Sequence, residues 1–236
     1  MTINKTKSMM VSPAVNTPRK RNFWGATPKG RHSKKESVAI LTVLRDYLGI
    51  ADKEREVTRI LNSGLVKLDG KVVKERRFGV GFMDLVTVDQ VNANYRILYD
   101  RKGRLSAVAD NKNTGIKLVK VTGKKSTSKG TYSITFHDGQ TVLTQDASIK
   151  PNDVLVISVP DKKIDQILKL GQGARVFMTG GLHVGETGTI KSIEVKESSQ
   201  SNLVTLEEGF STTIDNVFVI GNSKYSFDLG AGGSVK

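Results

Sequence analysis

Cysteine is absent from the 236 residues, so disulfide bonds, thiolate zinc sites and cysteine nucleophiles are excluded. The three histidines, His32, His137 and His183, are widely scattered along the chain, which predicts no metal site. No stretch approaches the roughly 18 apolar residues that span a bilayer, and residues 1–35 lack the apolar core of a secretory signal. We therefore expect a cytoplasmic protein without a membrane partner.

Sequence patterns of nucleotide-dependent catalysis are also missing. The glycine-rich segment 171–188 contains neither Gly-x-x-x-x-Gly-Lys-Ser/Thr nor Gly-x-Gly-x-x-Gly, the patterns that hold nucleotide phosphates. Asp100, Asp138 and Asp161 lie beside glycine or lysine in turn-like contexts, and we interpret them as turn formers. The sequence predicts a protein that is not an enzyme and that needs no cofactor, metal or small-molecule substrate.

Charge of one sign dominates the beginning of the chain. The whole sequence has 37 Lys and Arg against 23 Asp and Glu, and residues 1–35 hold nine of these cations and no acidic residue. The net charge of +14 indicates a polyanionic partner, most commonly nucleic acid and less often an anionic membrane. A mitochondrial targeting peptide is also basic, but Pro13, Pro18 and Pro28 would interrupt its amphipathic helix.

Residues 1–32 are expected to form an irregular tail that is ordered only by a partner. The segment 18–24 interleaves cations with two aromatic residues, and Trp24 is the only tryptophan of the chain. A disordered, solubilising tail is one interpretation. We favour an arm that lies along RNA, with cations on phosphates and Trp24 or Phe23 stacked on a base or packed into the body.

A first helix is predicted after this arm. Ser33 and Glu36 are spaced as a capping box, apolar residues follow at helical spacing over 40–48, and Gly49 can end the helix. Lys34 and Lys35 would then lie in the first turn, where the helix dipole disfavours cations. A phosphate contact would offset that local cost.

A second helix and a hairpin follow. The helix is expected to begin at Asp52 and to stop at Gly64, with Arg55 and Arg59 on one exposed face. Residues 65–74 alternate around Asp-Gly, which is typical of a hairpin with a type I′ turn, and 82–88 resemble a further strand. In this register Val73 pairs with Val66, and Lys67 and Lys74 lie on the other face.

The two helices and the hairpin resemble the S-four RNA-binding module. The resemblance lies in residues 56–73 and in Gly81-Phe-Met-Asp-Leu-Val86. This module occurs in ribosomal proteins, some pseudouridine synthases and some tRNA synthetases, so it does not by itself determine the function. It implies that the second helix and the hairpin dock against folded RNA.

Short alternating runs punctuated by turns fill residues 95–170, which predicts a small all-β barrel or sandwich. From residue 171 onward, a strand, a glycine-rich turn and Gly185-x-x-Gly188-x-Ile190 look like a KOW motif. That motif occurs in SH3-like barrels of ribosomal proteins and transcription elongation factors. Val176, Met178 and Ile190 are expected to face inward.

One family joins these parts in this order, the small-subunit ribosomal protein four of the archaeal and eukaryotic "e" type. The chain is similar to it from Asn22 to Gly221, most specifically at 81–84, 95–104, 178–181 and 218–221. The resemblance implies a structural constituent of the small subunit that binds ribosomal RNA beside neighbouring ribosomal proteins. Modest length and the lack of cysteine are closer to archaeal members.

The predicted fold class is α+β and multidomain. It comprises a basic N-terminal extension (1–36), an S-four-type module of helices and a β-hairpin (37–94), a central all-β domain (95–170), and a KOW SH3-like barrel with the C-terminal tail (171–236). The predicted RNA-binding residues are Arg19, Lys20, Arg21, Trp24, Lys29, Arg31, Lys34 and Lys35 in the arm, and Arg55, Arg59, Lys67, Lys71, Lys74, Arg76 and Arg77 in the module.

Three other functions share parts of this sequence pattern. A pseudouridine synthase would need a large catalytic α/β domain that the short β segments of 95–236 cannot supply. A transcription elongation factor with a KOW barrel would need neither the S-four module nor the arm. A free RNA-binding factor of ribosome assembly or stress would use the same surfaces, and only the resemblance over all three domains disfavours it.

Overall fold

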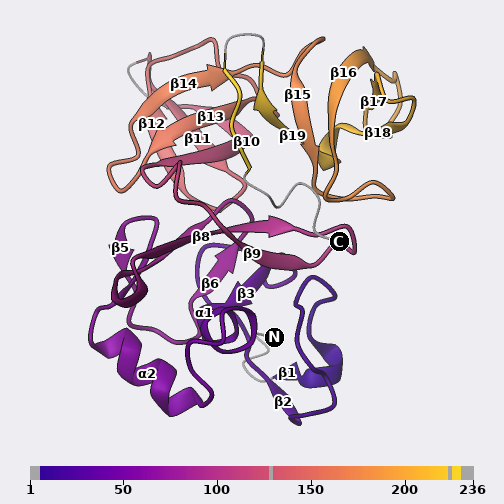
Figure 1. Cartoon of the computed structure of the whole chain (residues 1–236). Helices are drawn as coiled ribbons and strands as arrows, with labels where there is room; N and C mark the ends of the chain where they lie inside the picture. Colours follow the sequence, from indigo (N-terminus) through magenta and orange to yellow (C-terminus); the bar gives the residue numbers. More distant parts are fainter. Residues whose placement is uncertain (1–5, 128–129, 223–224, 230–236) are drawn as a thin grey trace. The chain divides into compact units, whose positions relative to one another are not determined.

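The structure, a computed structural model, describes residues 6–127, 130–222 and 225–229, and the chain divides into two compact units, 1–115 and 116–236 (Figure 1). Most elements are antiparallel strands, and the helices are few and short. In these residues no helix is long and apolar enough to cross a membrane. The fold is therefore mostly β.

A five-stranded antiparallel sheet in the order β5-β4-β7-β8-β9 organises the first unit. A second, two-stranded pairing joins β3 to β6. The strands are β3 (Ser37–Ala39), β4 (Val66–Leu68), β5 (Lys71–Val72), β6 (Gly79–Gly81), β7 (Leu85–Val88), β8 (Ala93–Tyr99) and β9 (Leu105–Ala109).

The hairpin forms as expected from Asp-Gly. Asp69 and Gly70 have φ values of 49° and 74°, the left-handed pair that a type I′ turn requires, and the amide of Val73 donates to the Val66 carbonyl at 3.1 Å. Val66 and Val73 are both buried. The predicted register is confirmed.

The first predicted helix begins later than its capping-box pattern suggests. Residues 37–39 are strand β3, and helix α1 (Ile40–Thr42) continues as a π-helical turn (Val43–Tyr47) before Gly49 turns left-handed at φ 62°. Ser33 instead forms a tight turn, whose carbonyl accepts from the Glu36 amide and the Ser37 hydroxyl. The capping box was wrong, and the dipole argument for Lys34 and Lys35 fails with it.

The second helix, α2 (Glu54–Asn62), begins two residues after the predicted N-cap. The Glu56 carboxylate accepts from the amides of Asp52 and Lys53, at 2.9 and 3.2 Å, and these bonds lower the pKa of Glu56. Val57 and Leu61 are its fully buried residues, and Gly64 ends it at φ 73°.

Residues 6–36, called the N-terminal segment below, are folded as part of the first unit and do not form the predicted irregular tail. Strands β1 (Thr6–Lys7) and β2 (Trp24–Gly25) pair, with a 3₁₀ turn (Ser8–Met10) between them. Val11 and Val15 are buried, and the Leu105 amide donates to the Ala14 carbonyl at 2.7 Å. The polar composition of 1–32 did not predict this folding, because only two buried valines anchor the segment.

The second unit contains two five-stranded antiparallel sheets. The first has the order β12-β11-β10-β13-β14 and a core built on Val119, Phe136 and Leu155. Its strands are β10 (Ile116–Ser126), β11 (Tyr132–Phe136), β12 (Thr141–Thr144), β13 (Val154–Ser158) and β14 (Ile164–Leu168). Strand β10 pairs with β13 through its first half and with β11 through its second half, so it curves between them.

The second sheet of this unit has the order β18-β17-β16-β15-β19. Val176, Met178 and Ile190 are buried in it, as the alternation predicted. Its strands are β15 (Arg175–Met178), β16 (Thr187–Glu194), β17 (Leu203–Leu206), β18 (Ser211–Thr213) and β19 (Val217–Gly221). Two 3₁₀ turns complete the described elements, Asp89–Val91 in the first unit and Ile214–Asn216 in the second.

Strands β8 and β9 belong to the first unit. They continue the sheet of the β4–β5 hairpin, with β8 paired to β7 and to β9. Residues 95–109 had been placed in the central β domain because they alternate like its strands. Alternation reports a strand but cannot report which sheet the strand joins.

Candidate nucleic-acid interface

Four exposed cations lie on α2 and on, or just after, the β4–β5 hairpin. Arg55, Arg59, Lys71 and Lys74 have exposed side chains, and among the described residues none of the four takes part in an ion pair. The hairpin connects to the start of α2 through Arg76, whose Nη1 lies 2.6 Å from Oε1 of Glu54. We call the four exposed cations, Arg55, Arg59, Lys71 and Lys74, the α2–hairpin face. In Figure 1, α2 and β5 lie at the same edge of the first unit.

Three further predicted cations of the module already have partners within the unit. Lys67 Nζ lies 2.7 Å from Asp89 Oδ2, Arg76 pairs with Glu54, and Arg77 Nε donates to the Thr27 carbonyl at 3.3 Å. The first two pairs are about 40–50% exposed, so they contribute little to stability and can exchange a carboxylate for a phosphate. Sequence order alone did not separate these three from the four unpaired cations.

Most of the predicted cations of the arm lie at the surface of the folded N-terminal segment. Lys20, Arg21, Lys29, Lys34 and Lys35 are exposed. Arg19 is half-buried, and its guanidinium donates to the carbonyls of Met9 and Ser12 at 3.4 and 3.2 Å. Phe23 and Trp24 are 64% and 55% exposed and stand edge to face, with ring centroids 4.8 Å apart.

Arg31 was predicted to neutralise a phosphate, but in the structure it is paired with carboxylates of the protein. Its guanidinium donates to the carboxylates of Asp69 and Asp84, both of which are buried. His32 is 4% exposed, and its Nε2 lies 2.8 Å from Oδ2 of Asp84. The positive charge of Arg31 therefore compensates two carboxylates inside the unit.

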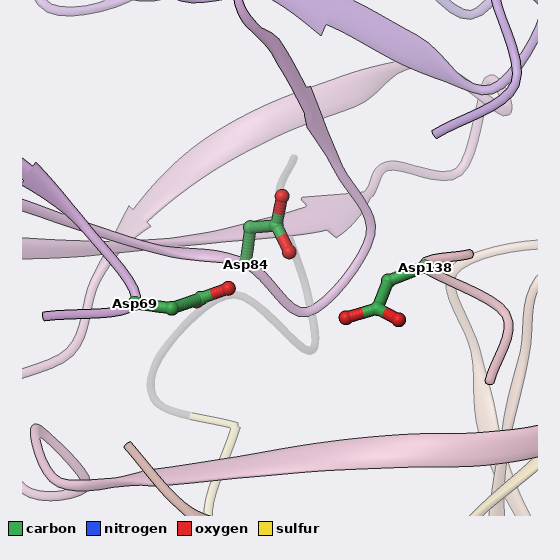
Figure 2. Close-up of side chains that lie close together, drawn as sticks. All are labelled: Asp69, Asp84 and Asp138. Carbon is green, nitrogen blue, oxygen red and sulfur yellow. The ribbon is translucent and has the colours of Figure 1, made fainter. Parts of the chain in front are cut away.

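Asp69 and Asp84 come from different turns of the first unit. Oxygen atoms of the two carboxylates lie within 4.8 Å of each other. Figure 2 shows the two side chains close together. Asp69 Oδ1 accepts from the Leu85 amide at 3.0 Å, and Asp84 Oδ2 accepts from the Gly81 amide at 2.9 Å. We call Arg31, His32, Asp69 and Asp84 the buried charge cluster. It ties the N-terminal segment to the hairpin turn and to β6.

A second buried ion pair, between Arg96 of β8 and Asp110 after β9, contacts the turn that contains Asp84. Arg96 Nε lies 2.6 Å from Asp110 Oδ2 with both side chains buried, and Arg96 Nη1 donates to the Met83 carbonyl at 3.2 Å. Met83 has a φ of 67°, unusual for a residue with a side chain. The bond from Arg96 to its carbonyl helps to hold that conformation.

The second unit buries two lysines. Lys117 Nζ lies 3.0 Å from Asp138 Oδ2; burial acts to raise the pKa of Asp138, but the charge of Lys117 and the bond from the Gln140 amide lower it overall. Lys120 donates to the carbonyls of Ile214, Asp215 and Val217 at 2.8–3.0 Å. Burial lowers the pKa of Lys120 to about 8. This lysine links β10 to the start of β19.

The buried charge cluster and the two buried lysines were not identified from sequence. Asp69 and Asp138 were interpreted as turn formers, and both do occupy turns, but their carboxylates are also buried ion-pair partners. The one available signal was that residues 81–84 and 95–104 are two of the four most specific stretches of the family resemblance. They include Asp84 and Arg96.

Comparison with known proteins agrees with this fold. The family model described as ribosomal family S4e matches residues 91–164. The chain is 50% identical to small ribosomal subunit protein eS4 of Thermoplasma volcanium over 98% of each chain, and 37% identical to eS4 of Archaeoglobus fulgidus over 95% of this chain and 97% of that one.

A solved structure is similar as well. The crystal structure of the 30S ribosomal protein S4e from Thermoplasma acidophilum superposes with a TM-score of 0.74 at 47% identity, covering 82% of this chain and 99% of that one. Identity well above 30% over nearly the whole length shows common descent, and the predicted family is confirmed: the chain belongs to the ribosomal S4e family.

Proposed function

We propose that this protein is a structural constituent of the small ribosomal subunit, located in the cytoplasm, that binds ribosomal RNA and supports translation. The observation that carries the proposal is the match over nearly the whole chain to proteins named small ribosomal subunit protein eS4. The exposed cations of the first unit supply the physical means. No step of this function requires the chain to act as an enzyme.

The α2–hairpin face is the proposed main contact with RNA. Its four cations are exposed and unpaired within the described residues, so binding a phosphate costs no existing ion pair. A helix and a tight hairpin hold their backbone positions, which favours recognition of backbone shape. Base sequence is poorly accessible in folded RNA, because its major groove is deep and narrow.

The cations of the N-terminal segment form the second part of the proposed surface. Lys20, Arg21, Lys29, Lys34 and Lys35 are exposed. Arg31 is not part of the proposed surface because it is paired with buried Asp84, and Arg19 is half-buried with its guanidinium on the Ser12 carbonyl. Lys67, Arg76 and Arg77 remain candidates that would exchange partners on binding. Because the segment is folded, it would bring these charges to RNA without a large ordering cost.

The domain organisation is proposed as an S-four-type module, a central β domain and a KOW SH3-like barrel. The module, with its N-terminal segment, corresponds to the first compact unit, and its sheet extends to residue 109. The five strands β15–β19, with their glycine-rich β15–β16 turn, support the barrel. Residues 230–236 of the predicted C-terminal tail lie outside the described residues.

Neighbouring ribosomal proteins are the proposed partners of the C-terminal barrel. Residues 171–236 contain seven acidic and five basic residues, in a chain whose overall charge is +14. This slight negative charge disfavours RNA and suits a basic protein neighbour. The barrel of an elongation factor would also bind proteins, but such a factor has no use for the cationic first unit.

The test is co-sedimentation with small subunits of the source organism after a wash in high salt. A structural constituent stays with the subunit, because many contacts release together only when the particle opens. A free assembly or stress factor is released into the supernatant as its phosphate contacts weaken with salt. A protein found only in ribosome-free fractions would contradict the proposal.

A further inference from the structure

An open cleft lies beside Trp24 on the N-terminal segment. Its volume is about 650 Å³, within the range of about 300–1,000 Å³ that is typical of ligand sites. The apolar part of its lining comes from Met10, Val11, Pro13, Val15 and Trp24. Met10 and Trp24 are 74% and 55% exposed, while the two valines are buried beneath them.

The rim of this cleft is cationic. Lys7, Lys34 and Lys35 line it, and residues 6–35 contain no acidic residue. Lys7 Nζ lies 5.3 Å from the centroid of the Phe23 ring, and that ring stands edge to face with Trp24. A flat aromatic wall with ammonium groups beside it suits a ligand that carries both an apolar face and a negative charge.

The cleft is built into the fold. Ser12 Oγ donates to the Lys35 carbonyl at 2.5 Å, which joins the two walls. The Asn16 amide donates to the hydroxyl oxygen of Tyr47 at 3.0 Å, and burial raises the pKa of Tyr47 to about 12. The walls are therefore formed before a ligand binds, and binding costs little conformational entropy.

A second cleft continues from the first toward α2. It measures about 340 Å³, shares Val11, Val15 and Trp24 with the first, and reaches Arg76 and Arg77. Arg76 pairs with Glu54 at the first residue of α2. The two clefts therefore adjoin, and together they extend from the rim lysines to Arg76 and Glu54 at the start of α2.

We propose that the cleft beside Trp24 binds an unpaired nucleotide of the RNA. Its base lies against the Trp24 indole, and its phosphate lies among Lys7, Lys34 and Lys35. The inference rests on the proposed function, under which the polyanionic partner of this protein is RNA. The two sites then bind different parts of the RNA: the α2–hairpin face binds the backbone of folded RNA, and the cleft binds an unstacked base. Base–aromatic stacking of this kind accepts any base.

The only tryptophan of the chain reports directly on the proposed contact. Short oligoadenylate is titrated into the full-length protein while Trp24 fluorescence is followed, and an RNA duplex and inorganic polyphosphate serve as comparison ligands. We expect strong quenching by oligoadenylate and little by the duplex or polyphosphate, because neither of these offers an unstacked base. Equal quenching by polyphosphate would show a site for anions only and would overturn the inference.

Variants separate stacking from folding. Because both variants lack the tryptophan reporter, binding is followed by the fluorescence anisotropy of labelled oligoadenylate. Trp24→Ala should weaken oligoadenylate binding roughly tenfold or more, and Trp24→Phe should restore most of it. Trp24 is exposed and pairs through its backbone with Lys7, so neither change should unfold the unit, which circular dichroism checks. An unchanged affinity in Trp24→Ala, or quenching by polyglutamate as strong as by oligoadenylate, would contradict a nucleotide site.

The double variant Arg55→Glu/Arg59→Glu distinguishes this inference from the proposed function. It should lose affinity for the duplex and keep the quenching of Trp24 by oligoadenylate. If the native protein binds the duplex but oligoadenylate leaves Trp24 unaffected, only the cleft inference fails. If the native protein binds neither the RNA duplex nor oligoadenylate, both proposals fail.

Discussion

The guanidinium of Arg31 and the carboxylate of Asp84 are 3.1 Å apart, measured from Nη2 to Oδ1, and the side chain of Asp84 is completely buried. Arg31 comes from the cationic N-terminal segment and Asp84 from the turn before β7. Their contact connects the segment to the rest of the first unit. It also means that one cation of the segment serves the fold.

Replacing Asp84 with asparagine should destabilise the first unit. The variant keeps the shape of the side chain but leaves Arg31 without one of its two carboxylates and removes the charged partner of His32. Breaking one side of a buried charge network costs about 3–5 kcal/mol in the free energy of unfolding. Denaturant unfolding with hydrogen-exchange readout on peptides of residues 6–115 measures the loss.

Asp52→Asn is the matched control, since Asp52 is an exposed aspartate of the same unit. A surface change of this kind should alter the free energy of unfolding by less than about 0.5 kcal/mol. Equal effects of the two variants would show that the buried charge cluster contributes nothing special to the fold.

Gly81→Ala should disturb the buried charge cluster, because the added methyl group needs space that the His32 ring occupies. A β-carbon at Gly81 would overlap the His32 ring, which is 4% exposed and is in contact with Asp84. Overpacking of a closed site costs about 1–3 kcal/mol in the free energy of unfolding. At Gly115 an added β-carbon meets no atom within 4 Å, so Gly115→Ala should unfold like the native chain. Thermal unfolding of both variants checks the difference.

Lys120 should make the stability of the second unit depend on pH. Burial lowers its pKa to about 8, whereas the unfolded chain regains the ordinary value of 10.5. Between these two values the unfolded chain binds the extra proton, so the free energy of unfolding rises with pH across the window. The rise contributed by this one group is on the order of 3 kcal/mol.

Lys120→Met removes that titration. The stability of the native chain relative to this variant should therefore increase from pH 8 to pH 10.5, as measured by denaturant unfolding at several pH values. Lys163→Met, at an exposed lysine of the same unit, should show no such trend relative to the native chain. A flat difference for Lys120→Met would mean that the buried amine keeps an ordinary pKa.

Reversing two charges of the α2–hairpin face should weaken RNA binding in a salt-dependent way. In Arg55→Glu/Arg59→Glu, two phosphate contacts are lost. The negative slope of log K against log salt should therefore become shallower, by roughly 1.4–1.8 in magnitude. The slope is measured by fluorescence anisotropy with labelled small-subunit RNA. Arg175→Glu/Lys191→Glu, exposed cations of the second unit, should leave it nearly unchanged. Equal slopes in both variants would exclude the α2–hairpin face as the main contact.

Local patterns predicted local structure well. Asp69-Gly70 predicted the hairpin and its register, and Gly64 and Gly49 ended their helical segments as expected. The α2 helix was predicted to within two residues of its start. Each of these depends on the dihedral preferences of a few neighbouring residues, which are present in the sequence itself.

The first helix shows where local reasoning stops. Ser33 and Glu36 have capping-box spacing, yet Ser37–Ala39 pair with Gly79–Gly81 as a strand. The partner strand lies some forty residues away in the sequence, and its pairing outweighs a local helix start. No window around Ser33 contains that information.

The sequence by itself determined the family, the sign of the charge and the order of the predicted parts. Tertiary structure decided which cations have partners within the protein: Arg31 is enclosed by Asp69 and Asp84, Lys67 and Arg76 are ion-paired, and Arg55, Arg59, Lys71 and Lys74 are free of ion pairs among the described residues. The reason is physical. A charge is counted from the sequence, but its pairing depends on carboxylates that folding brings close from distant parts of the chain.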